Sequence, residues 1–386
     1  MVHHVFLVPG FFGFANLGDL KYFAHVREYL LSAFARRGLG VHIDVVATRP
    51  TASLPNRAER VLATMAQTLQ DDDGPVHLIG HSSGGLDVRL LLSPGVTLPT
   101  ELDVERYARQ VRTAVTVATP HHGTPLAAFF TSLLGQRLLQ VLSLATISIL
   151  RFGHLPVSAL IQLGAVIARM DGLFGLNSAL LDEIFAQLLS DFSPERRRAL
   201  AAFFREVGGD QALLVQITPE AMEVFNACTR PRPGVHAGSV VTRARPPGVA
   251  STLAVGLDPA AQATLALYAA RHRLARLPPD RVPPLEDAQA DVLRAAFGTV
   301  PDAAANDGMV PTRSQAWGEI ILAVQADHLD VVGHFGDPAH DPPHIDWITT
   351  GSGCNTARFE ELWAAVVDFM LAARVPDMQA SRSAAS

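Results

Sequence analysis

Residues 77–85 read HLIGHSSGG, an apolar run followed at once by two serines between small residues. The run VHLIG (76–80) predicts a buried strand, and GLDVRLLL (85–92) predicts a helix directly after it. Between them GHSSG (80–84) fits the pattern G-x-S-x-G, in which small residues allow a sharp turn that holds the central serine above the sheet edge. Such a short pattern also fits an ordinary Gly/Ser turn. The strand before it and the helix after it favour a nucleophile at Ser82.

Strand and helix patterns alternate around this turn. Strands are predicted at 4–10, 41–50, 76–80 and 111–120, and helices at 19–38, 56–70 and 85–92. Alternation of this kind requires crossover connections and therefore predicts an α/β core with a mostly parallel sheet. Further strands are predicted at 238–245 and 319–326, and a closing helix at 357–373.

The alternation is interrupted after residue 124, and this predicts the domain organisation. Residues 1–124 would form the first part of the core and residues 235–386 the second part. Residues 125–234 are apolar and mainly helical in pattern, so we expect a helical insertion. Within the second part, the Pro- and Ala-rich stretch 246–300 is expected to be irregular, and the tail 375–386 to be frayed.

Composition excludes several classes of protein. Of the 386 residues, 48% are hydrophobic and 18% are charged, which allows a large core and excludes wholesale disorder. The net charge is 31 − 37 = −6 without a block of basic residues, which argues against a nucleic-acid partner. Two cysteines are too few for a disulfide framework or a cysteine-based zinc site.

The sequence predicts neither a leader nor a transmembrane segment. Its first residues, MVHHVFLVPG, lack the charged and apolar regions of a signal peptide. As written the protein is expected to be cytoplasmic, and a secreted mature form whose leader has been removed is the alternative. The longest uncharged apolar run, 138–150, is shorter than the roughly 20 residues that a membrane-spanning helix needs.

A serine nucleophile needs donors for the developing oxyanion and a neighbouring base. In a strand–serine–helix turn one donor is the N–H of the next residue, here Ser83. The second comes from a loop after an early strand, and LVPGFFGF (7–14) places the N–H of Phe11 in such a loop. The alternative for this segment is a glycine turn with core phenylalanines.

The acid and the base are expected in the chain order Ser, Asp, His. Asp307 lies in the turn-forming segment NDGMVPTRSQAWG (306–318), just before the last predicted strand. His328 lies in ADHLD (326–330), just after that strand. The alternatives that remain are Asp302 and Asp327 for the acid, and His334, His340 and His344 for the base.

Together these segments resemble the bacterial triacylglycerol lipases. The resemblance includes HLIGHSSGGLDVR (77–89), VTVATPHHGTPLA (115–127), ITPEAMEVFNA (217–227), and the segments around Asp307 and His328. It implies the α/β-hydrolase fold, a helical lid or cap, Ser82 as nucleophile with Asp307 and His328, and Phe11 and Ser83 as backbone donors. Pro9 departs from the family pattern, which usually has a histidine there.

The resemblance bears on metals as well. No cofactor is implied for the reaction, but many members bind a structural Ca²⁺ through the residue that corresponds to Asp330. The other calcium ligands cannot be matched in this sequence. The loop 333–348 holds three histidines and three aspartates, a composition that would also allow a zinc site. Because it shows no recognised ligand spacing, we favour a proline-stiffened polar loop beside the active site.

The expected function is hydrolysis of carboxylic esters through an acyl-enzyme, with a lipid or long-chain ester as substrate. The alternatives are an acyltransferase or a polyester depolymerase with the same triad, or a non-catalytic lipid-binding relative.

Residues 126–170 carry few charges, so we expect them to form a lid over Ser82 that opens at an oil–water interface. The alternative is an ordinary buried helical subdomain. Acyl-chain preference and oligomeric state cannot be read from the sequence.

Overall fold

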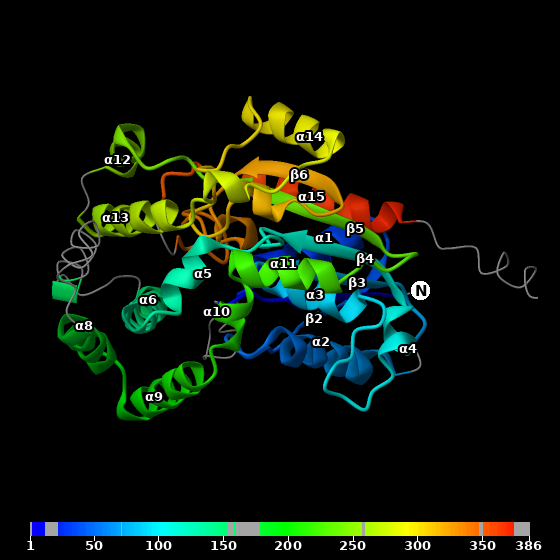
Figure 1. The fold of residues 1–386 in the computed structure, drawn as a ribbon, viewed down its shortest axis with the longest axis horizontal. Coiled ribbons are helices and arrows are strands. Elements are labelled where there is room, and N and C mark those ends of the chain that lie inside the picture. The colour runs from blue at the N-terminus through cyan, green and yellow to red at the C-terminus, as the bar shows by residue number, and fades with distance from the viewer. Residues whose placement is uncertain are drawn as a thin grey trace, which may run out of the picture.

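A six-stranded parallel sheet with the strand order β2-β1-β3-β4-β5-β6 forms the centre of the protein (Figure 1). The computed structural model describes residues 2–11, 22–70, 72–152, 158–159, 162, 178–256, 259–346 and 350–373. The strands are β1 (Val2–Val8), β2 (Gly40–Val45), β3 (Val76–His81), β4 (Val111–Val117), β5 (His236–Arg243) and β6 (Glu319–Gln325).

The central strands are buried on both faces, which explains their unbroken apolar runs. Every residue of β3 is buried, and so are residues 4–8 of β1. Val8 pairs with Gly80, so β1 and β3 end side by side at the same edge. The chain runs from β1 to β2 on one side and later to β3 on the other. This reversal creates a crevice at the carboxyl ends of β1 and β3, where ligands bind in open α/β sheets.

Two pairs of helices flank the sheet. The helices α1 (Ala24–Arg36) and α15 (Thr356–Ala372) contact one another, and α15 also contacts β4 and β6. The helices α2 (Leu54–Leu69) and α3 (Gly84–Leu92) contact one another and β1. The short helix α4 (Val104–Ala108) precedes β4. The predicted parallel α/β core with flanking helices is therefore confirmed.

Further helices follow β4 and β5, and most of them lie on the side of the molecule opposite the N-terminus (Figure 1). Those after β4 are α5 (Pro125–Phe130), α6 (Leu133–Phe152), α8 (Ser178–Ser190), α9 (Pro194–Gly209), α10 (Ala212–Gln216) and α11 (Pro219–Cys228). Those after β5 are α12 (Val249–Val255), α13 (Pro259–Leu274) and α14 (Asp287–Phe297). Since every strand runs in parallel from the N-terminal side, most of these helices lie toward the carboxyl edge of the sheet.

The expectation of an irregular stretch at 246–300 is wrong, because α12, α13 and α14 occupy much of it. The helix α14 begins at a capping box between Glu286 and Gln289 and ends at Gly298, which adopts a left-handed conformation. Leu293 is its one fully buried residue. Because α14 buries only one side chain, its sequence shows little of the helical repeat of apolar residues. Its capping residues identify the helix better.

Several predicted boundaries shift. The strand expected at 41–50 ends at Val45, and the helix expected at 19–38 begins at Ala24. Residues 12–21 and most of the tail, 374–386, lie outside the described residues. The division into two core parts and an insertion remains a prediction. Among the described residues, no helix has both the length and the apolar character needed to cross a membrane.

Candidate active site

Ser82 occupies a strained turn at the carboxyl end of β3. Its φ is 56°, in the left-handed region that non-glycine residues rarely adopt. The Ser82 N–H donates to the Val117 carbonyl over 2.9 Å, which anchors the turn to the end of β4. A Cβ at Gly84 would lie 2.2 Å from the Val8 carbonyl oxygen, so only glycine lets α3 start this close to β1. The sequence pattern around Ser82 thus has a steric cause.

The end of β1 approaches this serine directly. A Cβ at Gly10 would lie 2.5 Å from the Ser82 Cβ, so the backbone before Phe11 passes against the serine itself. Phe11 is 7% exposed and lines the same pocket as Ser82. The structure therefore places Phe11 close to Ser82 and to its neighbour Ser83, and their roles in the reaction stay a prediction.

Arg57 links the two sides of this crevice. Its guanidinium contacts Asp87 on α3 over 2.7 Å and donates to the Pro9 carbonyl over 2.7 Å, with both charged side chains fully buried. Breaking a buried ion pair by removing one partner costs about 3–5 kcal/mol. The pair thus joins the first turn of α3 to the loop that carries Gly10 and Phe11.

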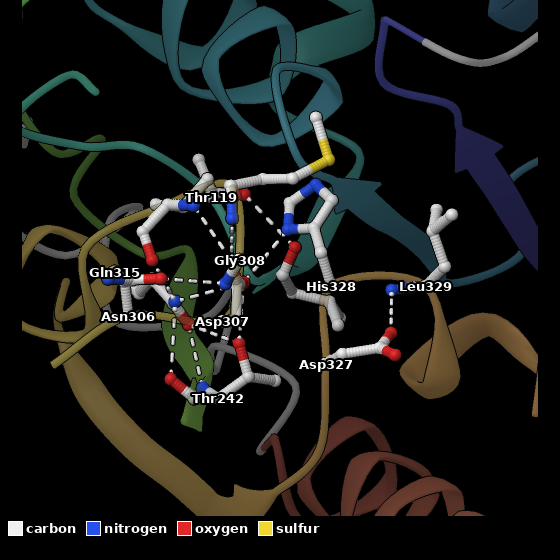
Figure 2. A network of polar contacts seen from close by, with 12 residues as sticks. Thr119, Thr242, Asn306, Asp307, Gly308, Gln315, Asp327, His328 and Leu329 are labelled. Carbon is white, nitrogen blue, oxygen red and sulfur yellow. Dashed lines mark hydrogen bonds and ion pairs between the residues drawn. The ribbon is translucent and has the colours of Figure 1, made fainter. Parts of the chain in front are cut away.

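Asp307 and His328 form a buried hydrogen-bonded pair (Figure 2). The His328 Nδ1 lies 2.8 Å from Asp307 Oδ2, and the two residues are 2% and 1% exposed. A carboxylate only accepts, so the Nδ1 carries the proton and the Nε2 is the basic nitrogen. This is the tautomer that a serine-activating histidine needs.

The Asp307 carboxylate is held by donors on all sides. Its Oδ1 accepts from the N–H groups of Met309 and Val310 over 2.9 and 2.7 Å. Its Oδ2 accepts from Thr242 Oγ1 over 2.8 Å and from Gln315 Nε2 over 3.1 Å, in addition to His328 (Figure 2). With this many donors the carboxylate has little freedom to turn away from the imidazole.

His81 connects the serine turn to the histidine loop. Its Nε2 donates to the His328 carbonyl over 2.8 Å, and the two rings lie 4.8 Å apart. Burial is the main reason why the pKa of His81 lies well below its usual value, so this ring stays neutral. No hydrogen bond joins Ser82 Oγ to the His328 Nε2, which is buried without a partner among the described residues. Such bonds often tighten only when substrate binds.

The alternative acids and bases have other partners. Asp302 is exposed and accepts from the N–H groups of Ala304 and Ala305. Asp327 accepts from the N–H groups of Leu329 and Asp330 and from Thr350. His334 and His344 each bond a backbone carbonyl, those of Tyr22 and Gly333. His340 likewise bonds the Pro342 carbonyl. Of the acids considered, Asp307 is the one bonded to His328.

An apolar pocket opens beside Ser82. It encloses about 430 Å³, including the space at its mouth. Helices α5 and α6 supply Leu126, Phe130 and Leu139 to its wall, and α10 supplies Leu214. The other lining residues are Phe11, Pro120, Thr124, Ala127, Ile217, Met309 and Val310. Part of the segment 126–170 therefore lies against the serine pocket, as the sequence predicts.

Asp330, the predicted calcium ligand, is fully buried. Its Oδ2 accepts from the Asp327 N–H over 2.8 Å, and burial together with the nearby Asp327 carboxylate raises its pKa well above the usual value. Among the described residues, Asp330 belongs to no group of three converging side chains of the types that hold metals. Calcium binding stays a prediction.

Several site residues escaped the sequence reasoning. Thr242 and Gln315 fix Asp307, and the Tyr22 hydroxyl donates to His81 Nδ1 over 2.5 Å. Gln315 falls in the same turn-rich segment as Asp307, and His81 falls inside the serine pattern, so both had a local signal. Thr242 and Tyr22 lie in other elements, and nothing near them in the chain marks them.

Comparison with known proteins supports the fold. No family model and no curated protein matches the sequence. EstA from Clostridium botulinum is similar in structure, with 17% identity and a TM-score of 0.50 over 97% of this chain and 88% of that one. Staphylococcus hyicus lipase matches with 14% identity and a TM-score of 0.49 over 96% and 95% of the two chains. The parallel sheet, the serine turn and the likeness to EstA identify the fold of this chain as α/β-hydrolase.

Proposed function

We propose that the protein is a serine hydrolase of carboxylic esters, with a lipid or another long-chain acyl ester as substrate. The observation that carries this proposal is the Asp307–His328 pair at the sheet edge where Ser82 lines an apolar pocket. A buried histidine with a fixed tautomer, positioned at the same sheet edge as a serine on a turn, is the arrangement that acyl transfer to serine uses.

Each residue has one task in the proposed reaction. His328 Nε2 takes the proton of Ser82 while the serine oxygen attacks the ester carbonyl, and Asp307 stabilises the imidazolium through the bond to Nδ1. The N–H groups of Phe11 and Ser83 would hold the oxyanion. The protonated His328 then gives its proton to the leaving alcohol, and water releases the acid from the serine by the reverse route.

The pocket lining supports a fatty acyl group as the bound part of the substrate. Its walls are aliphatic and aromatic side chains from α5, α6 and α10, which offer dispersion contacts and no charge. We propose that α5 and α6 act as a lid. Their apolar side chains line the pocket in water and would prefer lipid at an oil surface, so the closed and open states would exchange by population shift.

Replacing the two neighbouring serines separately tests the reaction. Ser82→Ala should abolish hydrolysis of p-nitrophenyl esters and labelling by a fluorophosphonate probe. Ser83→Ala keeps the peptide N–H and removes a hydroxyl that is buried without a partner among the described residues, so the probe should still label it. Rates on short and long esters, below and above their solubility, measure the acyl preference. Turnover by Ser82→Ala would overturn the proposal, and product transfer to an added alcohol would indicate an acyltransferase.

A further inference from the structure

Three histidines from distant parts of the chain converge beside the active site. His25 lies in the first turn of α1, and His340 and His344 lie in the loop after β6. One ring nitrogen from each of the three lies within 4.8 Å of the other two. The rings of His25 and His344 stack with their centroids 3.7 Å apart, and those of His340 and His344 lie 4.6 Å apart.

Hydrogen bonds to backbone carbonyls determine which ring nitrogen of each histidine carries the proton and which one has a free lone pair. His344 Nδ1 lies 2.7 Å from the Gly333 carbonyl, and His340 Nδ1 lies 2.8 Å from the Pro342 carbonyl. A carbonyl only accepts, so both Nδ1 atoms carry protons and both Nε2 atoms carry lone pairs. The Pro343 carbonyl accepts a hydrogen bond from the His25 ring, and the His25 Nδ1 has no partner, so the Nε2 is the donor.

The unpartnered nitrogen of His25 is the feature that ring stacking does not explain. His25 is 8% exposed, and its Nδ1 is buried without a hydrogen bond among the described residues. A buried acceptor without a partner is destabilising and is rare in folded proteins. Burial first, and then the neighbouring His344 and His340, lower the pKa of His25 to about 4. The ring is therefore neutral at physiological pH, the state in which imidazole binds metals.

The loop that carries His340 and His344 is held in place independently. Asp337 and His344 exchange two backbone hydrogen bonds of 3.2 and 3.0 Å, which close the loop between them. The Asp337 carboxylate accepts from the Ala339 N–H and from Thr356 Oγ1 on α15. On the other side the loop packs against α1, where a Cβ at Gly333 would lie 2.8 Å from the His25 Cβ. Such a loop loses little freedom when it binds an ion.

We propose that His25, His340 and His344 form a binding site for a divalent transition metal, with zinc as the favoured ion. Three imidazoles, each donating its second nitrogen to a backbone carbonyl, match the ligand type and the outer hydrogen bonds of zinc sites in proteins. Water or a small anion would complete the tetrahedral coordination. The site is separate from Asp330, which contributes no ligand to it.

The position of the site indicates a bracing role. Tyr22 precedes His25 by less than one helical turn, and its hydroxyl contacts His81 while its carbonyl accepts from His334. A metal bound by the three histidines would join the start of α1 to the loop that follows His328. It would then stabilise the wall of the active site, because an ion that binds only the folded state raises the free energy of unfolding.

Zinc titration of the full-length, chelator-treated protein tests the site. Calorimetry should give one Zn²⁺ per chain, and Zn²⁺ should raise the melting temperature. His340→Ala changes a partly exposed residue, so it should fold and should raise the dissociation constant for Zn²⁺ by at least about tenfold. His25→Asn should do the same. Cobalt(II) in place of zinc should give the visible absorption bands of a tetrahedral site, and these should be absent in His340→Ala.

His42→Ala is the matched control, because His42 has a half-exposed side chain and lies outside the cluster. It should bind zinc as the unaltered protein does, which would exclude general binding to surface histidines. Circular dichroism confirms that each variant is folded. The proposal is overturned if the protein does not bind Zn²⁺ stoichiometrically, or if folded His340→Ala and His25→Asn bind it with unchanged affinity. None of these measurements depends on esterase activity.

Discussion

The proposed catalytic serine is placed by steric constraints on its neighbours. Ser82 has a positive φ, and the turn that holds it fits against β1 only because Gly10 and Gly84 lack side chains. Backbone strain of this kind costs about 1–3 kcal/mol and persists where the surroundings fix it. The backbone at the carboxyl edge of the sheet is therefore strained at Ser82, the residue proposed to attack the substrate.

Gly10→Ala should disable the site without unfolding the protein. The new Cβ would lie 2.5 Å from the Ser82 Cβ, so the serine or the Phe11 loop must move. A misplacement of about 1 Å can lower the rate roughly 100-fold. We expect such a loss in kcat/KM on a soluble p-nitrophenyl ester. Gly40→Ala, whose Cβ would meet Val2 at 3.5 Å, is the control and should keep its activity. Equal activity in both variants would contradict the close approach at Gly10.

Asp307→Asn should lower kcat by about 10⁴, because an amide can donate to His328 Nδ1 and thereby favour the wrong tautomer. The donors that surround Asp307 should preserve the fold, so the melting temperature should change much less than the activity. Asp302→Asn is the control, since Asp302 is an exposed acid in the same segment and has no contact with His328. If Asp302→Asn showed the larger loss of kcat, the acid would be misassigned.

Residues with local signals could be predicted from the sequence, and residues defined by their distant neighbours could not. Ser82 was predictable because strand, turn and helix follow one another within a few residues. Asp307 and His328 flank the last strand, so both were expected at the carboxyl edge, and the resemblance to the lipases favoured them over the other acids and histidines there. The His25 partner of His340 and His344 left no trace in the sequence, because α1 and the loop after β6 meet only in the folded chain.

At the scale of elements, the strands were easier to predict than the helices outside the core. Every strand of the described sheet was predicted to within a few residues. The central strands β1, β3 and β4 were clear because buried parallel strands are continuously apolar. The helices α12, α13 and α14 were missed, because the Pro and Ala enrichment of 246–300 favoured an irregular stretch, and a capping box is found at α14 but not at α12. The apolar helices α5 and α6 were expected against the serine pocket, and their residues do line it.

Phe130→Ala tests whether α5 and α6 form a lid. Phe130 is 5% exposed and lines the pocket, and removal of a buried phenylalanine side chain costs about 3–5 kcal/mol. The closed state should lose this contact energy and the open state should not. We expect the unaltered protein to show a steep rise in activity when substrate droplets form, and Phe130→Ala to show a weaker one.

Leu31→Ala on α1 is the control for this comparison, because Leu31 is an exposed apolar residue on another helix. It should keep the steep rise. The readout is the ratio of activity on an emulsified long-chain ester to activity on a dissolved short-chain ester. Plain saturation kinetics of the unaltered protein on both substrates would leave α5 and α6 as fixed walls of an esterase pocket.

At the scale of the whole molecule, buried neutral histidines should govern stability in acid. For seven histidines burial is the largest cause of a lowered pKa. The pKa is lowered to about 3 for His77 and His334, and to about 4 for His25, His122 and His272. The pKa values of His81 and His121 lie well below the usual value. Because the folded pKa lies below the unfolded one, the unfolded chain takes up protons first as the pH falls. The stabilisation is therefore complete above about pH 6.5 and is lost progressively below it.

His77 is the best residue on which to measure this effect, since it lies at the start of β3, far from the proposed active site. It is 1% exposed and bonds His3 and Thr113, and burial lowers its pKa to about 3. One such histidine should remove about 2 kcal/mol from the free energy of unfolding between pH 7 and pH 5. His77→Gln keeps polar atoms at this position but cannot titrate, so its free energy of unfolding should fall less steeply as the pH is lowered.

His42→Gln, at a half-exposed site, is the control and should retain the full pH dependence. Urea unfolding at both pH values measures the difference, and parallel curves for His77→Gln and the unaltered protein would show that His77 is not the proton acceptor.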